Sequence, residues 1–333
     1  MKSVVLFSIA IIILFTHCNN MKASNSDSIP AWQLVSNWPQ LPADYKLGNP
    51  TGIGIDSNQH IFVFHRANRD WSIFSSMPST PITQNTVLEL DNTTGKIINS
   101  WGANLFVMPH GLKIDDDNNI WLTDVGLHQV FKFTHNGKLL MKLGEAGIAG
   151  NDSAHFNRPT DVAVAKDGSF YVSDGYGNSR IMKFSATGKY LLEWGSKGNK
   201  PGEFNIPHGI TLDNNGNVYV ADRQNNRIQV FDSNGNFLNQ WKQNDFANMY
   251  AVTFDAKNNR IIGADYLIKF ELFSKGSNII VFDTTGNIHA KFGRGGLYNG
   301  PVCRYHDIAI DKEGCIYVGD IKNNSIQKFV PQK

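Results

Sequence analysis

The chain has 333 residues, of which 41% are hydrophobic and 18% are charged, and its formal net charge at pH 7 is +2. A net charge this small gives no sign of a polybasic surface, which argues against a nucleic-acid-binding protein. The 30 glycines suit a chain rich in turns, and the 21 phenylalanines suit one that fills the space between packed sheets.

The first 18 residues predict an export signal. Lys2 gives a charged start, and residues 4–15 form an apolar core that is shorter than a typical membrane-spanning helix. Cys18 is followed by two asparagines as in a bacterial lipoprotein junction, although His17 stands where a small residue is usual. We therefore expect residues 19–30 to be a polar tether and the protein to be exported, periplasmic or at the cell surface, with its only membrane attachment a lipid on Cys18.

Residues 31–333 are predicted to form one domain, because a strand-turn-strand unit recurs through them. The six units begin at Gly52, Gly111, Asp161, Gly209, Ala251 and Asp307. Most units continue with a third strand that ends in an aromatic residue and with a fourth strand, so each is predicted to be a four-stranded antiparallel meander. Six such units at a spacing of about 50 residues indicate an all-β, six-bladed β-propeller.

The sixth unit lacks an outer strand before the chain ends. Residues 32–35 (WQLV) are the natural candidate for that strand, because pairing them there would close the ring and remove an open edge. We expect a monomer, as complete propellers often are.

Two units carry insertions. Residues 67–84 form a long loop in unit one that contains Trp71 and Phe74, and residues 265–275 expand unit five with Tyr266, Phe270 and Phe273. Loops of this length are often functional. Each insertion could form a wall of a binding site, and the loop of unit one could equally be a surface excursion.

Three histidines recur at one position of the repeat. His110, His208 and His306 precede the first strands of units two, four and six, and the intervals 208 − 110 and 306 − 208 are both 98 residues. First strands line the channel of a propeller and alternate blades are about 120° apart, so the imidazoles should converge on the axis. Three histidines with an open fourth position describe a catalytic zinc site. The alternative is that Pro-His-Gly is only turn chemistry between blades.

Other polar residues are predicted to surround this metal. Tyr176, Arg66 and Arg223 lie in loops after second strands, which open on the same face as the histidines. Asp307 follows the third histidine and could orient a ligand, bind a hard cation in the channel or cap the backbone. His128, His135 and His155 have no matching partners in the repeat, so we expect them to be ordinary, whereas His65 stays open because it is next to Arg66 on the metal face.

This residue set suggests a class of chemistry. Zinc held by neutral imidazoles can bind a hydroxyl oxygen or polarise a carbonyl, and a neighbouring tyrosine can act as a general base. Arginine pairs with carboxylates. The residues therefore predict a small substrate that carries a hydroxyl group and a carboxylate.

Two cysteines remain in the mature chain, Cys303 and Cys315. The hairpin that contains them separates them along its strands by more than the roughly 7 Å that a disulfide spans. We expect two free, partly buried thiols.

From residue 48 to residue 329 the chain resembles the peptidyl-α-hydroxyglycine α-amidating lyases, which are six-bladed propellers with NHL repeats. The most specific segments are 122–132 (LTDVGLHQVFK), 158–164 (RPTDVAV) and 173–181 (SDGYGNSRI). By this resemblance, zinc is held by His110, His208 and His306, and the catalytic residues are Tyr176, Arg66 and Arg223. The resemblance also implies a structural calcium, held by the Asp307 carboxylate and the backbone carbonyls of Ile53 and Leu112.

The implied reaction cleaves a peptide or acyl group ending in α-hydroxyglycine to an amide and glyoxylate. The chain departs from the family at Ala67 and Asn68, which replace Gly-Asp, and at Arg304, which replaces a methionine. It also contains nothing that could act as the copper monooxygenase of animal amidating systems, so the natural substrate could be a different carbinolamide. Two other functions stay open, a calcium-dependent hydrolase of the lactonase kind and a non-catalytic NHL binding module at the cell surface.

Overall fold

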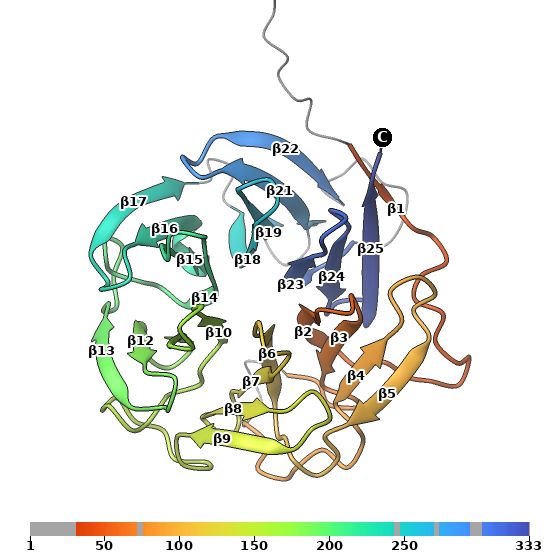
Figure 1. The fold of residues 1–333 in the computed structure, drawn as a ribbon, viewed down its shortest axis with the longest axis horizontal. Coiled ribbons are helices and arrows are strands. Elements are labelled where there is room, and N and C mark those ends of the chain that lie inside the picture. The colour runs from red at the N-terminus through yellow and green to blue at the C-terminus, as the bar shows by residue number, and fades with distance from the viewer. Residues whose placement is uncertain (1–30, 72–75, 243–246, 270–272, 294–301, 333) are drawn as a thin grey trace, which may run out of the picture.

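The computed structural model describes residues 31–71, 76–242, 247–269, 273–293 and 302–332. It confirms an all-β propeller in which six antiparallel sheets stand around a common centre (Figure 1). Within these ranges there is no α-helix, and one 3-10 turn spans Arg223–Asn225. No helix in the described ranges is long and apolar enough to cross a membrane. The predicted signal, Cys18 and the tether lie outside the described residues.

The first four blades are meanders whose strands run in order from the centre of the ring outward (Figure 1). Blade one contains β2 (Pro50–Ile55), β3 (Ile61–His65), β4 (Val87–Leu90) and β5 (Ile97–Trp101). Blade two contains β6 (Pro109–Ile114), β7 (Ile120–Asp124), β8 (Gln129–Phe133) and β9 (Leu139–Leu143). Blade three contains β10 (Asp161–Val164), β11 (Phe170–Asp174), β12 (Arg180–Phe184) and β13 (Tyr190–Trp194). Blade four contains β14 (Pro207–Leu212), β15 (Val218–Asp222), β16 (Arg227–Phe231) and β17 (Phe237–Lys242).

Blades five and six differ from this plan. Blade five contains β18 (Asn248–Asp255), β19 (Arg260–Lys269), β21 (Asn278–Asp283) and β22 (Ile288–Gly293). The predicted expansion of unit five forms β20 (Phe273–Gly276), which pairs with the far end of β19, while Phe270 lies outside the described residues. Blade six contains β23 (Tyr305–Ile310), β24 (Ile316–Asp320), β25 (Ser325–Pro331) and β1 (Trp32–Leu34).

The N-terminal strand closes the ring as predicted. β1 is the outer strand of blade six and pairs antiparallel with β25, with Trp32 opposite Pro331 and Leu34 opposite Phe329 (Figure 1). The Trp32 indole N–H donates to the carbonyl of Gly314 at 2.9 Å, and its ring stacks on Phe292 with centroids 5.0 Å apart. These contacts fix the closing strand against both blade six and blade five.

The hydrophobic core is a ring of six clusters, and each cluster fills the space between two neighbouring blades. Because blades pack on both faces, every residue of β3, β7, β11, β15 and β24 is buried. The outer strands β9 and β13 alternate between exposed and half-buried residues instead. Burial of this kind makes the inner strands a rigid support for residues at their ends.

Cys303 and Cys315 form no disulfide with each other, as predicted. Cys315 is half-buried, whereas Cys303 is fully buried in the cluster between blades five and six.

Candidate active site

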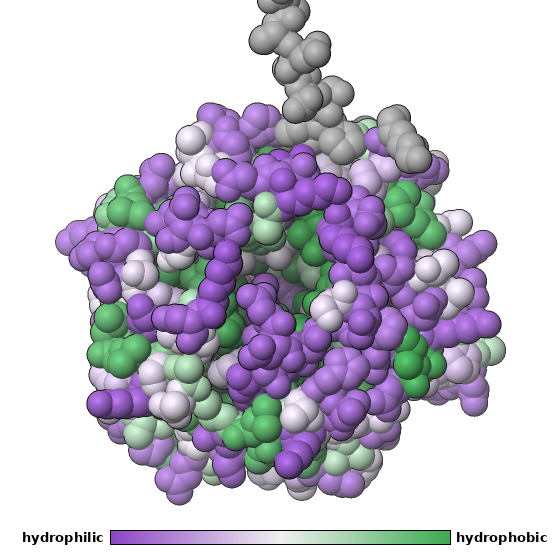
Figure 2. All heavy atoms as spheres, viewed as in Figure 1, coloured by the Kyte–Doolittle hydropathy of each residue, from purple (hydrophilic) through white to green (hydrophobic). Residues whose placement is uncertain are grey.

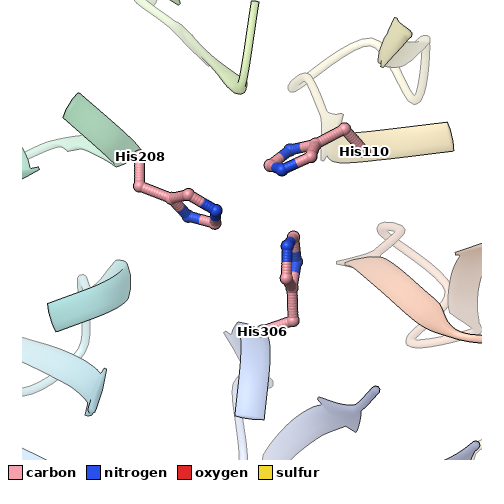
Figure 3. Close-up of side chains that lie close together, drawn as sticks. All are labelled: His110, His208 and His306. Atoms are coloured by element: carbon pink, nitrogen blue, oxygen red, sulfur yellow. The ribbon is translucent and has the colours of Figure 1, made fainter. Parts of the chain in front are cut away.

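The three predicted histidines meet at the centre of the ring (Figure 3). Each is the second residue of an inner strand, in β6, β14 and β23, and each is at most 3% exposed. Their ring centroids form a nearly equilateral triangle with sides of 4.8, 4.6 and 4.8 Å. One nitrogen from each ring lies within 4.8 Å of the other two. The geometry therefore brings together a ligand set of the kind that holds a single metal ion.

The histidines are oriented by the blades between them. The Nδ1 atoms of His110, His208 and His306 lie 2.6, 2.7 and 2.8 Å from the backbone carbonyls of Thr160, Tyr250 and Thr51. A carbonyl oxygen only accepts hydrogen bonds, so Nδ1 carries the proton in each ring and the Nε2 lone pair is free for a metal. These three residues hold the equivalent position in blades three, five and one. The sequence analysis did not anticipate that their backbone would position the ligands.

All three imidazoles are held in the neutral form. Burial is the main cause that lowers the pKa of each histidine well below its usual range. The positive charges of Arg66 and Arg223 lower the pKa of His110 further, and His110 in turn lowers the pKa of His208 and His306. Metal ions bind the neutral imidazole, so the site is prepared for binding near neutral pH.

Tyr176 and Arg223 join this cluster as predicted. The Tyr176 hydroxyl lies 3.1 Å from Nε2 of His110 and 3.2 Å from Nε2 of His208. Arg223 donates from Nη1 to the same hydroxyl at 3.2 Å, and its guanidinium lies 5.4 Å from the centroid of the tyrosine ring. A phenol and a cation therefore stand directly beside the free nitrogens of the histidines.

The same kind of backbone hydrogen bond positions each of the three predicted catalytic residues. The N–H groups of Arg66, Tyr176 and Arg223 donate to carbonyls two residues before the histidine position of their own blades, at Asn49, Arg158 and Ile206. This position therefore recurs between blades, and only the residue type differs.

The site contains three guanidinium groups. Arg66 donates to the carbonyl of Pro109 at 3.0 Å, and Arg304 donates to the Tyr250 hydroxyl and lies over the Tyr250 and Tyr266 rings. Among the described residues, no hydrogen-bond partner exists for three buried atoms, Arg66 Nη2, Arg223 Nε and Arg304 Nε. Buried polar atoms are nearly always paired, so these three indicate where a ligand oxyanion would bind.

The insertion of blade one forms a wall of the site. The Trp71 ring meets the Tyr176 ring edge to face with centroids 4.8 Å apart, and the Arg66 guanidinium lies 5.4 Å from the Trp71 ring. Trp71 and Met77 pack with Tyr176 against a small apolar cluster beside the site. Phe74 lies outside the described residues. The described part of the insertion therefore supports the prediction of a wall at this position.

A second polar site lies in the channel next to the histidines. A cavity of about 120 Å³ is lined by Asp161, Asp307, Ile53 and Leu112. Asp307 accepts hydrogen bonds from the N–H groups of Ile53 and Ile308, both at 2.8 Å. Burial raises the pKa of Asp307 to about 7, and burial together with Asp307 raises the pKa of Asp161. Two buried carboxylates in one cavity fit a hard divalent cation, and Asp161 is a candidate ligand that the sequence analysis did not name.

Among the other histidines, His135 lies with Asp56, His60 and Glu89, and one possible ligand atom from each of these residues lies within 4.8 Å of the others. These residues come from three segments of two blades, so only the packing of the blades brings them together.

The repeat sequence defines the class of propeller to which this chain belongs. Residues 106–133, 156–184 and 204–231 match the NHL repeat, so the chain is an NHL-repeat six-bladed propeller. The surface around its centre is mainly hydrophilic with a hollow in the middle (Figure 2). The virginiamycin B lyase of Staphylococcus aureus superposes with a TM-score of 0.55, 17% identity and coverage of 91% of this chain and 90% of that one. At this identity the match shows the shared fold alone.

The sequence relatives are more specific. Peptidyl-glycine alpha-amidating monooxygenase B of Xenopus laevis is 36% identical in an alignment that covers 90% of this chain and 35% of that protein. Peptidyl-alpha-hydroxyglycine alpha-amidating lyase 1 of Drosophila melanogaster is 35% identical in an alignment that covers 88% of this chain and 58% of that protein. The chain thus spans less than two thirds of either relative. The chain is thus similar in sequence to proteins named peptidyl-alpha-hydroxyglycine alpha-amidating lyase, which confirms the resemblance seen in the sequence.

Proposed function

We propose that this chain is a zinc-dependent carbon-nitrogen lyase that cleaves a peptidyl- or N-acyl-α-hydroxyglycine to an amide and glyoxylate. The observation that carries the proposal is the convergence of three imidazoles at the centre of the ring, next to the Tyr176 hydroxyl, which bonds two of them and Arg223. The names of the related lyases support the same reaction class.

The metal site would be formed by Nε2 of His110, His208 and His306. Their spacing, neutral state and carbonyl-bonded Nδ1 atoms fit a zinc ion with one position left for substrate. When bound, zinc would act as a Lewis acid that makes the substrate α-hydroxyl more acidic.

Tyr176 would be the general base. Its oxygen accepts a hydrogen bond from Arg223 and lies next to Nε2 of His110 and His208. As the base, this oxygen would take the proton from the α-hydroxyl, the carbonyl of glyoxylate would form, and the electron pair of the C–N bond would go to the amide nitrogen. Protonation of that nitrogen returns the proton and leaves the free amide, so atoms and charge balance.

The substrate carboxylate would be held by arginine. Arg223 bonds the base Tyr176 through Nη1, whereas Arg66 bonds a backbone carbonyl through Nε and its Nη2 has no partner among the described residues. We therefore assign the carboxylate to Arg66. The Trp71 wall beside Arg66 would exclude water and strengthen this ion pair.

A structural calcium would occupy the neighbouring cavity. Asp307 and Asp161 would neutralise it, and the backbone of Ile53 and Leu112 lines the same space. Because the N–H and C=O of one residue point to the same edge of an antiparallel strand, the Ile53 carbonyl faces the channel with its N–H. Carboxylate and carbonyl oxygens are the ligands that calcium prefers.

Glyoxylate release from an N-acyl-α-hydroxyglycine tests the proposal. The purified mature chain should release glyoxylate, lose this activity after chelation and regain it with zinc. Tyr176→Phe should lower kcat by roughly 100-fold or more, because a general base typically contributes at least that much. Tyr171→Phe is the matched control, since that hydroxyl bonds the remote carbonyl of Ser233. Equal rates for the two variants would contradict the role of Tyr176.

Metal analysis separates the two alternative functions. A lactonase-like hydrolase would hold calcium without zinc, and a non-catalytic binding module would show no turnover and would keep its binding after chelation. The histidine ligand set favours the lyase over a calcium hydrolase, because hard cations prefer oxygen ligands. Residues 1–18 further lead us to propose an exported protein with a lipid on Cys18.

A further inference from the structure

We propose a second transition-metal site, formed by Asp56, His60, Glu89 and His135 and called here the interblade cluster. Asp56 and His60 lie at the two ends of the turn between β2 and β3, Glu89 lies in β4, and His135 lies in the turn after β8. One possible ligand atom from each residue lies within 4.8 Å of the others. The cluster is separate from the central histidines, since Asp56 follows the opposite end of β2 from the active site.

The distances within the interblade cluster fit one tetrahedral ion. Nδ1 of His60 lies 2.8 Å from the Glu89 carboxylate and 3.6 Å from that of Asp56. Nε2 of His135 lies 3.1 Å from Asp56 and 3.6 Å from Glu89. Ligands of a tetrahedral zinc with bonds of about 2.0 to 2.1 Å are roughly 3.3 to 3.4 Å apart, which lies inside the observed range.

The ligand atoms are held in place by other contacts. Oδ1 of Asp56 accepts the backbone N–H of His60 at 2.7 Å, which leaves Oδ2 facing the two imidazoles. The edge-to-face contact between Phe62 and His135, with centroids 5.0 Å apart, fixes the second imidazole. The site therefore has the supporting contacts that orient metal ligands in proteins.

Burial and charge favour a divalent cation here. The side chains of Asp56 and Glu89 are 0% and 5% exposed, so two carboxylates face each other away from water. His60 and His135 are 31% and 29% exposed, which leaves the cluster open to an ion from solvent. A divalent ion with two carboxylates and two neutral imidazoles is a neutral unit. Mixed imidazole and carboxylate ligands suit zinc and similar first-row ions better than calcium or magnesium.

The proposed ion would join blades one and two, which also share an apolar cluster. Three ligands come from blade one and His135 comes from blade two. An ion that binds only the folded ring stabilises it against unfolding. We infer a structural role, because four protein ligands leave no open position for substrate.

The test compares zinc content and zinc-dependent stability. Apo protein is dialysed against buffered zinc, and bound metal is counted by inductively coupled plasma mass spectrometry. The wild type should hold one zinc per chain more than the double variant His60→Ala/His135→Ala. Zinc should raise the melting temperature of the wild type by more than that of the double variant. His155→Ala is the matched control, because His155 is 28% exposed and contacts Asp152 and Glu145 without such a cluster.

The outcome does not depend on the proposed lyase activity, since zinc stoichiometry is read directly. Glyoxylate release should be the same in the double variant and the wild type. If the double variant does not fold, as judged by circular dichroism, Glu89→Gln keeps the shape of the side chain and should also lose one zinc. Equal zinc content in the wild type and the folded variants would overturn the proposal and leave the cluster as two hydrogen-bonded His-carboxylate pairs.

Discussion

Arg304 is the residue at which this site departs most from the family pattern. Its guanidinium lies 5.3 Å from the Tyr250 ring and 5.1 Å from the Tyr266 ring, and its Nε has no partner among the described residues. Interactions with Tyr250, Tyr176 and Tyr266 raise its pKa despite burial, so it stays charged. A third, half-buried cation beside the buried Arg66 and Arg223 suits a substrate with a second anionic group.

We expect Arg304→Met to change substrate preference. The variant should lose about 10-fold in kcat/KM for N-succinyl-α-hydroxyglycine relative to N-acetyl-α-hydroxyglycine, because a charged hydrogen bond contributes about 1.5 kcal/mol or more. The ratio of the two substrates is the measurement, and it corrects for any general loss of activity. The same loss for both substrates would assign Arg304 a structural role only.

His65 predicts a pH dependence of stability. Its Nδ1 accepts the N–H of Ala67 at 3.1 Å, so the proton is on Nε2, 3.2 Å from the Tyr45 hydroxyl. Burial lowers the pKa of His65 to about 4. The unfolded chain has a pKa near 6.5 and takes up the proton first, so stability is full above about pH 6.5 and falls as pH decreases toward 4.

The contribution of His65 can be measured by urea denaturation. At about pH 5 the wild type should have lost about 2 kcal/mol of unfolding free energy through this group. His65→Asn keeps an acceptor for Ala67 but does not titrate. The difference in unfolding free energy between wild type and variant should therefore shrink by that amount between about pH 7.5 and pH 5. A difference in unfolding free energy that does not change with pH would show that protonation of His65 does not destabilise the folded protein.

At the scale of elements, glycine after the histidine lets neighbouring blades meet. A Cβ on Gly111 would lie 2.5 Å from the carbonyl oxygen of Thr160, the group that orients His110. A Cβ on Gly209 would lie 2.8 Å from Cα of Ala251 in the next blade. The Pro-His-Gly segments of blades two and four are therefore more than turns. Their glycines let the backbone of the next blade come close to the strand, and in blade two this places the Thr160 carbonyl against His110.

The closing strand β1 has a measurable role in stability. Trp32 is 6% exposed and contacts Phe292, Gly314 and Arg260. Trp32→Ala should lower the free energy of unfolding by roughly 3 kcal/mol, the usual cost of truncating a buried aromatic residue. Urea denaturation of the mature chain measures it. Ile288→Ala, at a side chain that is 52% exposed in the outer strand β22, should change stability by less than about 0.5 kcal/mol. A similar small effect for Trp32→Ala would mean that the ring stays closed without this anchor.

At the scale of the whole molecule, the channel cation should stabilise the ring. Asp161 and Asp307 come from blades three and six, so an ion between them links opposite sides of the propeller. Calcium should raise the melting temperature of the wild type by several degrees and that of Asp307→Asn by much less. In chelator, Asp307→Asn should be at least as stable as the wild type, because it removes one of two buried carboxylates that repel each other.

Thermal melts with and without calcium make this comparison. Asp117→Asn serves as the control, since that carboxylate is exposed and remote from the channel. If Asp307→Asn responds to calcium as strongly as the wild type does, the ion binds elsewhere.

The sequence by itself determined the architecture and the central ligand set. Repeated strand and turn patterns specify six blades. A strict period of 98 residues is enough to place three histidines around one axis, because equal numbers of repeats correspond to equal angles around a propeller. The closing strand could be predicted for the same reason, since an incomplete blade needs a partner.

Only the tertiary structure decided the rest. The carbonyls that orient the histidines belong to residues with unremarkable side chains, and backbone groups carry no signal in a sequence. Three arginine nitrogens have no hydrogen-bond partner among the described residues, and this depends on which groups the fold places around each side chain. The interblade cluster joins His135 to Asp56, 79 positions earlier, and it has no counterpart in the repeat. Contacts of this kind arise from how two blades pack, which is set by the whole ring and not by any local pattern.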